Sequence, residues 1–159
     1  MGAGVSALLL DLLAEGYESL DAVDISAAAL EQLRERLGPA VHSVRFVCAD
    51  VLELQLDGLV DVWHDRAVFH FLTDTSDQAT YVRRANDAVA PGGHVVMATF
   101  GPDGPLQCSG LPVVRHSAED LAALFSEGFE LVDSCTQDHV TPAGVSQSFT
   151  HALLVRTTT

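Results

Sequence analysis

A nearly continuous apolar run, "HVVMATF" at residues 94–100, constrains the fold of this chain more than any other feature. Such a run is typical of a strand that is buried on both faces, as in parallel sheets covered by helices. Around it, segments with strand patterning alternate with segments whose leucines recur at helical spacing. This order predicts an α/β fold, with a mostly parallel sheet and helices on both of its faces.

The boundaries of the expected elements follow from caps and turns. Ser26 is predicted to cap a helix that ends before Gly38, and Ser117 with Asp120 is predicted to form a capping box. Further helices are expected at 6–15, 76–89 and 118–126, and strands at 20–24, 44–50, 58–65, 94–100, 129–137 and 147–157. A Pro91-Gly92-Gly93 turn is expected before the strand at 94–100, and a loop is expected at 101–116. A second loop, with Pro142 and Gly144, is expected to join the last two strands as an antiparallel hairpin. At this length, residues 1–159 are expected to form one domain.

Composition excludes several classes of function. The chain has 22 acidic residues against 8 basic ones, all arginine, and a formal charge of −14, so nucleic acid is not an expected partner. No apolar run approaches the ~20 residues of a membrane span, and no secretory signal is present, so neither a membrane nor export is expected. The three cysteines, Cys48, Cys108 and Cys135, lack CxxC spacing and are expected to be free thiols in the cytoplasm.

The candidate site residues lie where strands end, because ligands of open α/β sheets bind outside the carboxyl ends of the strands. Gly2 and Gly4 form a Gly-x-Gly turn of the kind whose backbone N–H groups approach a nucleotide cofactor. Asp24 lies 20 residues after Gly4, close to the spacing at which a carboxylate accepts hydrogen bonds from ribose hydroxyls. Asp50 ends the next strand and could meet an adenine amino group. The structural alternatives are a plain turn for the glycines, a helix-start signal for Asp24 and a turn cap for Asp50.

The third strand ends in His64 and Asp65, which are candidates for proton transfer. His70 follows within "AVFHFL", where a buried core histidine is the alternative to a metal ligand. Cys108 has no histidine adjacent in sequence to activate it, which favours a structural thiol over a nucleophile.

The motifs "GAG", "AVDIS", "CADV", "VWHDRAVFHFL" and "APGGHVVMATF" follow one another along nearly the whole chain. This order resembles that of class I S-adenosylmethionine-dependent methyltransferases. The stretches "WHDRAVFHFL" and "ATFGPDGPLQCSGLPVVRH" are similar to a bacterial type 11/12-like group that acts on small molecules. The resemblance implies a Rossmann-like three-layer sandwich that uses S-adenosylmethionine. It also implies roles for individual residues: Gly2, Ala3 and Gly4 border the methionine part of the cofactor, Asp24 and Ile25 its ribose and adenine, Asp50 and Val51 its adenine, and His64 and Asp65 its methyl-donor end.

The expected reaction is methyl transfer to a small molecule through a nitrogen, oxygen or sulfur nucleophile. His64 or Asp65 would take a proton from the acceptor where one must leave. The resemblance does not choose among these acceptors.

The resemblance also indicates a missing strand, because in the family a central strand precedes the glycine turn with which this chain begins. Without it, the strands ending at Asp24 and Asp65 would each have an unpaired inner edge. Either the two strands pair directly, or a second chain covers the edges in a homodimer. The homodimer is the favoured expectation, because direct pairing would shift the helices packed on the sheet and close-packed cores resist such shifts.

A second hypothesis is a methyltransferase-like fold that has lost cofactor binding together with that strand. Its strand ends would offer oxygen and nitrogen donors to a divalent metal, as in a hydrolase or a binding protein. The donors are Asp24, Asp50, His64, Asp65 and His70. No HExxH or comparable motif supports this hypothesis.

Overall fold

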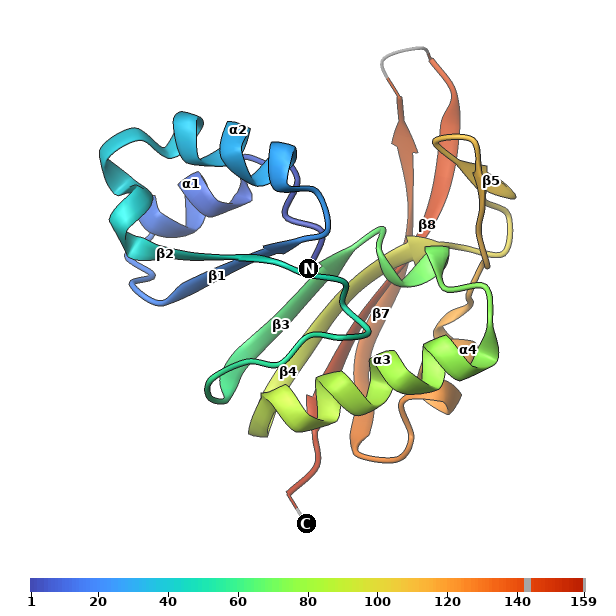
Figure 1. Ribbon diagram of the computed structural model, residues 1–159. Coiled ribbons are helices and arrows are strands. Elements are labelled where there is room, and N and C mark those ends of the chain that lie inside the picture. Colours follow the sequence, from blue (N-terminus) through green and yellow to red (C-terminus); the bar gives the residue numbers. More distant parts are fainter. Residues whose placement is uncertain (142–143, 159) are drawn as a thin grey trace. The chain divides into compact units, whose positions relative to one another are not determined.

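The computed structural model describes residues 1–141 and 144–158 (Figure 1). The chain divides into two compact units, Met1–Leu54 and Gln55–Thr159, and each is described by itself. Pro142, part of the predicted last loop, lies outside the described residues.

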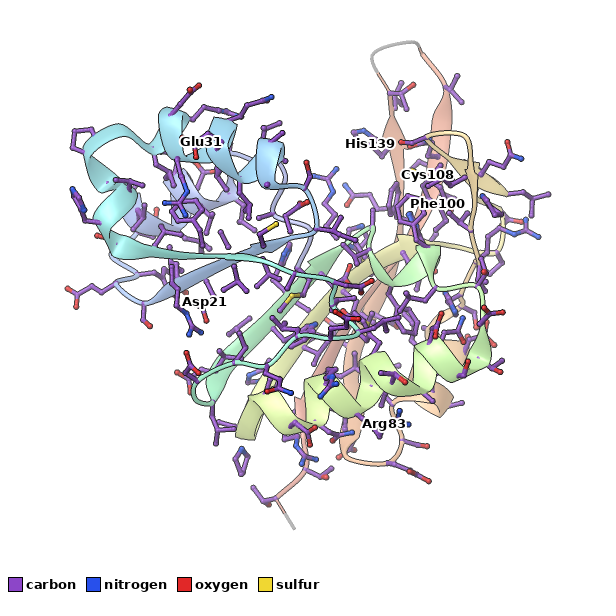
Figure 2. All side chains as sticks on the ribbon, viewed as in Figure 1. Asp21, Glu31, Arg83, Phe100, Cys108 and His139 are labelled. Atoms are coloured by element: carbon purple, nitrogen blue, oxygen red, sulfur yellow. The ribbon has the colours of Figure 1, made fainter. Side chains whose placement is uncertain are left out.

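The first unit has two helices and a pair of parallel strands. Its elements are α1 (Leu8–Ala14), β1 (Leu20–Asp24), α2 (Ala27–Leu37), the 3-10 turn η1 (Gly38–Ser43) and β2 (Val44–Cys48). Strands β1 and β2 pair in parallel from Leu20 opposite Val44 to Asp24 opposite Cys48. Asp21 on β1, labelled in Figure 2, accepts two hydrogen bonds of 2.7 Å from the opposite Arg45 on β2, and this contact favours the same register.

The core of the first unit follows from helical periodicity. Leu30, Leu33 and Leu37 form one apolar stripe on α2 and are buried against Leu9 of α1 and Ala22 of β1. The Ser26 hydroxyl accepts a hydrogen bond of 3.2 Å from the Ala29 N–H, which confirms the predicted helix cap. Gly38 ends α2 with φ 53°, a conformation that glycine adopts readily.

The second unit is built on a four-stranded sheet in the order β3-β4-β8-β7. Strands β3 and β4 are parallel, whereas β8 is antiparallel to both β4 and β7. The predicted C-terminal antiparallel hairpin and the interior position of residues 94–100 are therefore confirmed. The elements are β3 (Val60–Arg66), η2 (Phe69–Phe71), α3 (Thr75–Ala88), β4 (Val89–Phe100), β5 (Gln107–Cys108), β6 (Leu111–Pro112), α4 (Ala118–Leu124), β7 (Phe129–Val140) and β8 (Ser146–Arg156).

The two faces of this sheet carry different side chains, because neighbouring residues of a strand point to opposite faces. In β3, Trp63 lies opposite Val95 and Asp65 opposite Met97, and these positions share the face on which α3 packs (Figure 1). The Trp63 ring meets the ring of Tyr81 from α3 edge to face, with centroids 5.6 Å apart. The core of the unit lies between this face and the helices.

Two local predictions were wrong. Residues 91–93 do not form a turn but belong to β4, which begins at Val89 and shifts its register against β3 between Val60 and Val62. A Cβ on Gly93 would lie 2.9 Å from the carbonyl oxygens of Ala90 and Asp61, so this irregularity requires glycine. The expected loop at 101–116 contains the short antiparallel strands β5 and β6.

The pairing of the strands also differs from a single sheet. Within the described residues, β1 pairs with β2 in a two-stranded sheet, and β3 pairs with β4 in the four-stranded sheet. Direct pairing of the strands ending at Asp24 and Asp65, the less favoured expectation, stays a prediction. Association of two chains through these edges stays a prediction.

The capping box of α4 provides a test of local stability. The Asp120 N–H donates to the Ser117 hydroxyl at 3.1 Å, and the Ser117 N–H donates to the Asp120 carboxylate at 2.8 Å. We expect Ser117→Ala to lower the free energy of unfolding by about 1 kcal/mol, measured by urea denaturation. The control is Ser76→Ala, at an exposed position in the first turn of α3, which should change it by less than about 0.5 kcal/mol. Equal effects of the two substitutions would contradict this account of the cap.

Candidate functional site

The glycine turn of the first unit lies at the carboxyl end of β1. The Ala3 N–H donates to the Val23 carbonyl at 3.0 Å, and the Gly4 N–H donates to Oδ2 of Asp24 at 2.8 Å. Gly2 and Gly4 have φ values of 61° and 50°, which glycine adopts without steric cost. The structure therefore brings together the Gly-x-Gly turn and Asp24, which the sequence analysis selected for one site.

The Asp24 carboxylate accepts hydrogen bonds from two backbone N–H groups. Its Oδ2 accepts from Gly4, and its Oδ1 accepts from the Ser26 N–H at 2.8 Å, just before α2. Each carboxylate oxygen has a second lone pair, so both can still accept a hydrogen bond from a ligand. The next side chain, Ile25, is 72% exposed, which is unusual for an isoleucine. The helix-start role is thus present, and hydrogen bonding to ribose stays compatible with it.

Asp50 follows the neighbouring strand β2 and caps the turn after it. Its Oδ1 accepts the Leu52 N–H at 2.9 Å, and its carbonyl accepts the Glu53 N–H at 3.1 Å. The Ala49 N–H donates to the Asp24 carbonyl at 3.1 Å, which ties this turn to the end of β1. Val51 is buried. The structural alternative for Asp50 is therefore present, and its contact with adenine stays a prediction.

In the second unit, the strand geometry separates the two residues proposed for proton transfer. His64 lies opposite Val96 and Asp65 opposite Met97, so their side chains point to opposite faces of the sheet. His64 is half-buried, and burial lowers the pKa of its imidazole, which favours the neutral ring. A neutral imidazole can accept a proton, so His64 keeps the properties of a base.

Asp65 is enclosed in the helix-facing core. Its carboxylate accepts hydrogen bonds from the Tyr81 hydroxyl and from the Val68 N–H, the latter at 2.9 Å. The Trp63 indole donates to the Tyr81 oxygen at 2.8 Å. Burial raises the pKa of the Asp65 carboxyl, and burial and the adjacent Asp65 charge raise the pKa of the Tyr81 hydroxyl. Asp65 thus holds the turn after β3, where Ala67 has a φ of 64°, a conformation that costs energy for a residue with a Cβ.

His70, the last sequence-predicted candidate, is fully buried in η2. Its Nδ1 lies 3.4 Å from the Phe100 backbone nitrogen, which donates to it, and its ring packs against the Phe100 ring with centroids 4.6 Å apart. Burial and, to a lesser degree, the charge of a protonated His116 lower the pKa of His70 to about 4. The sequence analysis did not select His116, which ends the stretch "LPVVRH". The residues around it show no spacing or motif that distinguishes it from an ordinary loop residue.

The donors of the alternative metal hypothesis fall in different units. Asp24 and Asp50 belong to the first unit, whereas His64, Asp65 and His70 belong to the second. Across residues 1–141 and 144–158, no group of three or more His, Cys, Asp or Glu side chains could hold a metal ion. The metal hypothesis is therefore not favoured. None of the helices in the same residues has the length and apolar character that a membrane span needs.

Comparison with known proteins identifies the family. Residues 1–93 match the family described as "Methyltransferase domain", which is more than half of the chain. Comparison with curated proteins gives no match. The fold and the family match together define an α/β methyltransferase, as the sequence motifs predicted. The chain belongs to the methyltransferase domain family.

Solved structures share the fold at low sequence identity. A S-adenosylmethionine-dependent methyltransferase from Methanosarcina mazei has a TM-score of 0.81 at 14% identity and covers 99% of this chain and 91% of its own. The 1,6-didemethyltoxoflavin-N1-methyltransferase of Burkholderia thailandensis, solved with 1,6-didemethyltoxoflavin and S-adenosylhomocysteine, has a TM-score of 0.76 at 24% identity over 99% and 69% of the chains. The N-methyltransferase NodS of Bradyrhizobium japonicum WM9, solved with S-adenosylhomocysteine, has a TM-score of 0.71 at 16% identity over 96% and 74%.

The Asp65 network can be tested through Tyr81. We expect Tyr81→Phe to lower the free energy of unfolding by about 1–3 kcal/mol, because a buried carboxylate loses a hydrogen-bond donor and the Trp63 indole loses its acceptor. The control is Tyr17→Phe, since Tyr17 is 55% exposed and its hydroxyl can be hydrated. Urea denaturation at neutral pH measures both variants, and an equally small effect in each would contradict a role for the network in stability.

The buried His70 gives a dependence of stability on pH. Its pKa is about 4 in the folded chain and 6.5 ordinarily, so the unfolded chain binds the proton first as the pH falls. The contribution of the neutral His70 ring to the free energy of unfolding is therefore complete above pH 6.5, and it is lost as the pH falls towards 4. We expect the free energy of unfolding of wild type, relative to that of His70→Phe, to decrease from pH 7.5 to pH 4.5. The variant His42→Gln, at an exposed position, should follow wild type, and a difference independent of pH for His70→Phe would refute the assignment.

Proposed function

We propose that this chain catalyses the transfer of a methyl group from S-adenosylmethionine to a small-molecule acceptor. The observation that carries the proposal is the Asp24 carboxylate, which holds the Gly2–Gly4 turn at the carboxyl end of β1 and retains free lone pairs. The family match and the two neighbours solved with S-adenosylhomocysteine support the cofactor. The acidic surface, with a formal charge of −14, also favours a cationic sulfonium ligand.

The residues of the first unit fit the parts of such a cofactor. The Gly2–Gly4 turn lacks side chains at both glycines and would allow close approach of the methionine part, with Ala3 between them. Asp24 would accept hydrogen bonds from the ribose hydroxyls, and the exposed Ile25 would contact the adenine ring. Asp50 and Val51, in the turn tied to the end of β1, would border the adenine edge.

The second unit would supply the acceptor side of the reaction. The sulfonium of the cofactor provides the leaving group, so the protein contributes mainly orientation and exclusion of water. His64, neutral because burial lowers its pKa, would take a proton from the acceptor where one must leave. Asp65 would act through the turn that it holds, as a positioning residue for the segment from Arg66 to Phe71.

The class of acceptor is a small molecule with a nitrogen, oxygen or sulfur nucleophile. The neighbour from Burkholderia thailandensis was solved with 1,6-didemethyltoxoflavin, which supports a small acceptor rather than a macromolecule. The acidic charge of this chain also disfavours nucleic acid.

Substitution of Asp24 tests the cofactor proposal. We expect Asp24→Ala to weaken the binding of S-adenosylhomocysteine by ~1.5–3 kcal/mol, because hydrogen bonds to a charged group are lost, and Asp24→Asn to have a smaller effect. Isothermal titration calorimetry measures the affinity, and thermal unfolding checks that each variant is folded. The control is Asp11→Asn, at an exposed position on α1, which should bind like wild type. Unchanged affinity in a folded Asp24→Ala variant would remove Asp24 from the site.

A further inference from the structure

The helices α3 and α4 pack on one face of the four-stranded sheet in the second unit. Helix α3 covers the face of Asp65, and Phe125, the residue that caps the end of α4, lies on the same side, with its ring centroid 6.3 Å from that of Tyr81. The opposite face carries the alternate residues of β3, among them His64 and Arg66. Side chains of that face can therefore meet a ligand without displacing either helix.

The register of the sheet places Arg66 in one row with His151. Arg66 lies opposite Ala98 on β4, Ala98 lies opposite His151 on β8, and His151 lies opposite Cys135 on β7. Residues that are opposite one another point to the same face, and neighbouring strands lie about 4.8 Å apart. The backbones of Arg66 and His151 are therefore about 10 Å apart, with only the small Ala98 side chain between them, a span across which an arginine can reach.

Arg66 is an exposed cation that has neither a hydrogen bond nor an ion pair within residues 1–141 and 144–158. The chain has 22 acidic residues against 8 basic ones, so carboxylates are plentiful elsewhere on the molecule. The acidic residues that the register places on this face, Glu130 and Asp133, lie on β7, at the other edge of the sheet from β3. The Arg66 charge is therefore available to a ligand.

The two histidines nearest in register respond to this charge. Burial is the main cause of the lowered pKa of His64 and of His151, and the Arg66 charge lowers the pKa of each ring further. The guanidinium thus lies close to both imidazoles. Because both rings are neutral, this part of the face offers one positive charge, which matches a carboxylate better than a doubly charged phosphate.

The turn after Arg66 holds this residue in place. The Ala67 N–H donates to the Ala98 carbonyl at 2.8 Å, and the Val68 N–H donates to the Asp65 carboxylate at 2.9 Å. Ala67 has a φ of 64°, and such strain persists only where the surrounding contacts fix it, most often at functional sites. Arg66 is therefore positioned by a rigid turn at the carboxyl end of a strand, where α/β folds bind their ligands.

The rows on either side of Arg66 are apolar. Phe100 and Phe149 lie opposite one another in the row beyond Ala98, with ring centroids 4.8 Å apart. In the row before it, Val96 lies opposite Leu153, and both are half-buried. A ligand with a carboxylate and a small apolar body would match the charge and the apolar neighbours together.

We propose that Arg66 binds a carboxylate group of the methyl acceptor, which makes it a specificity-determining residue of the second unit. This inference rests on the proposed function, because it takes the carboxylate to belong to the acceptor. The planar guanidinium can donate two parallel hydrogen bonds to the carboxylate oxygens. His64 lies two residues before Arg66 on the same face, about 7 Å along the strand. A carboxylate on Arg66 would therefore hold the nucleophile of a small acceptor within reach of the His64 base.

The test uses benzoate as the probe and benzamide as its uncharged control, each added at millimolar concentration to the full chain labelled with 15N. We expect benzoate to shift the side-chain Nε signal of Arg66 in a saturable way, and benzamide to leave it unchanged. Bound benzoate would offset the Arg66 charge, so the pKa values of His64 and His151, followed through their ring 15N signals, should both rise. No shift of Arg66, the same shift with both compounds, or an equal shift of Arg83, an exposed arginine on α3 (Figure 2), would overturn the proposal.

Matched variants remove one positive charge at two different places. We expect Arg66→Gln to weaken benzoate binding, measured from the His151 ring signals, at least tenfold. Arg66→Lys, which keeps the charge without the planar fork, should weaken it less. Arg83→Gln removes the same charge from α3 and should bind benzoate within twofold of wild type, and thermal unfolding checks that each variant is folded. Equal losses in Arg66→Gln and Arg83→Gln would contradict a site at Arg66.

Affinity for S-adenosylhomocysteine separates the acceptor from the cofactor. This affinity should stay at the wild-type value in Arg66→Gln. Its loss there would overturn the inference, because Arg66 would then hold the carboxylate of the cofactor. Absence of S-adenosylhomocysteine binding to wild type would refute the proposed function, whereas benzoate binding that does not depend on Arg66 would refute only this inference.

Discussion

Backbone N–H groups in the turns that follow parallel strands need hydrogen-bond acceptors. In this chain, aspartate carboxylates are the acceptors at three strand ends. Asp24 accepts from Gly4 and Ser26, Asp50 caps the turn after β2, and Asp65 accepts from Val68. Each carboxylate therefore fixes the first residues beyond its strand, which are the residues that face a ligand in folds of this kind. The same interaction explains why structural and functional readings of these aspartates are hard to separate, since the carboxylate that shapes the turn also lies at the site.

The three aspartates differ in what remains for chemistry. Asp24 is half-buried, keeps open lone pairs and is followed by an exposed isoleucine, so it suits a polar ligand with an apolar ring. Asp65 is fully buried, and Tyr81 completes its coordination by hydrogen bonds, so it has no route to a substrate except through the turn that it positions. The chemistry of the second unit then depends on its imidazoles, which burial keeps neutral in His64, His70 and His116.

Features set by nearby residues were predictable from the sequence. The cap at Ser26, the capping box at Ser117 and the buried strand at 94–100 depend on local spacing, and all three are present. The Pro91-Gly92-Gly93 segment was mispredicted as a turn because its register shift against β3 is a tertiary feature. The burial of Asp65, His70 and His116 depends on which sheet face the helices cover and on contacts between distant segments, which no local pattern encodes.

The central claim is that Asp24 and the glycine turn form one cofactor-binding element. Backbone amide NMR of the 15N-labelled chain, titrated with S-adenosylhomocysteine, tests it most directly, because the Gly4 and Ser26 N–H groups are the two donors to that carboxylate. The account predicts saturable shifts of the amide signals of residues 2–4 and 24–26 at a common dissociation constant. Binding that leaves these signals unchanged while shifting others, or no binding at all, would contradict it.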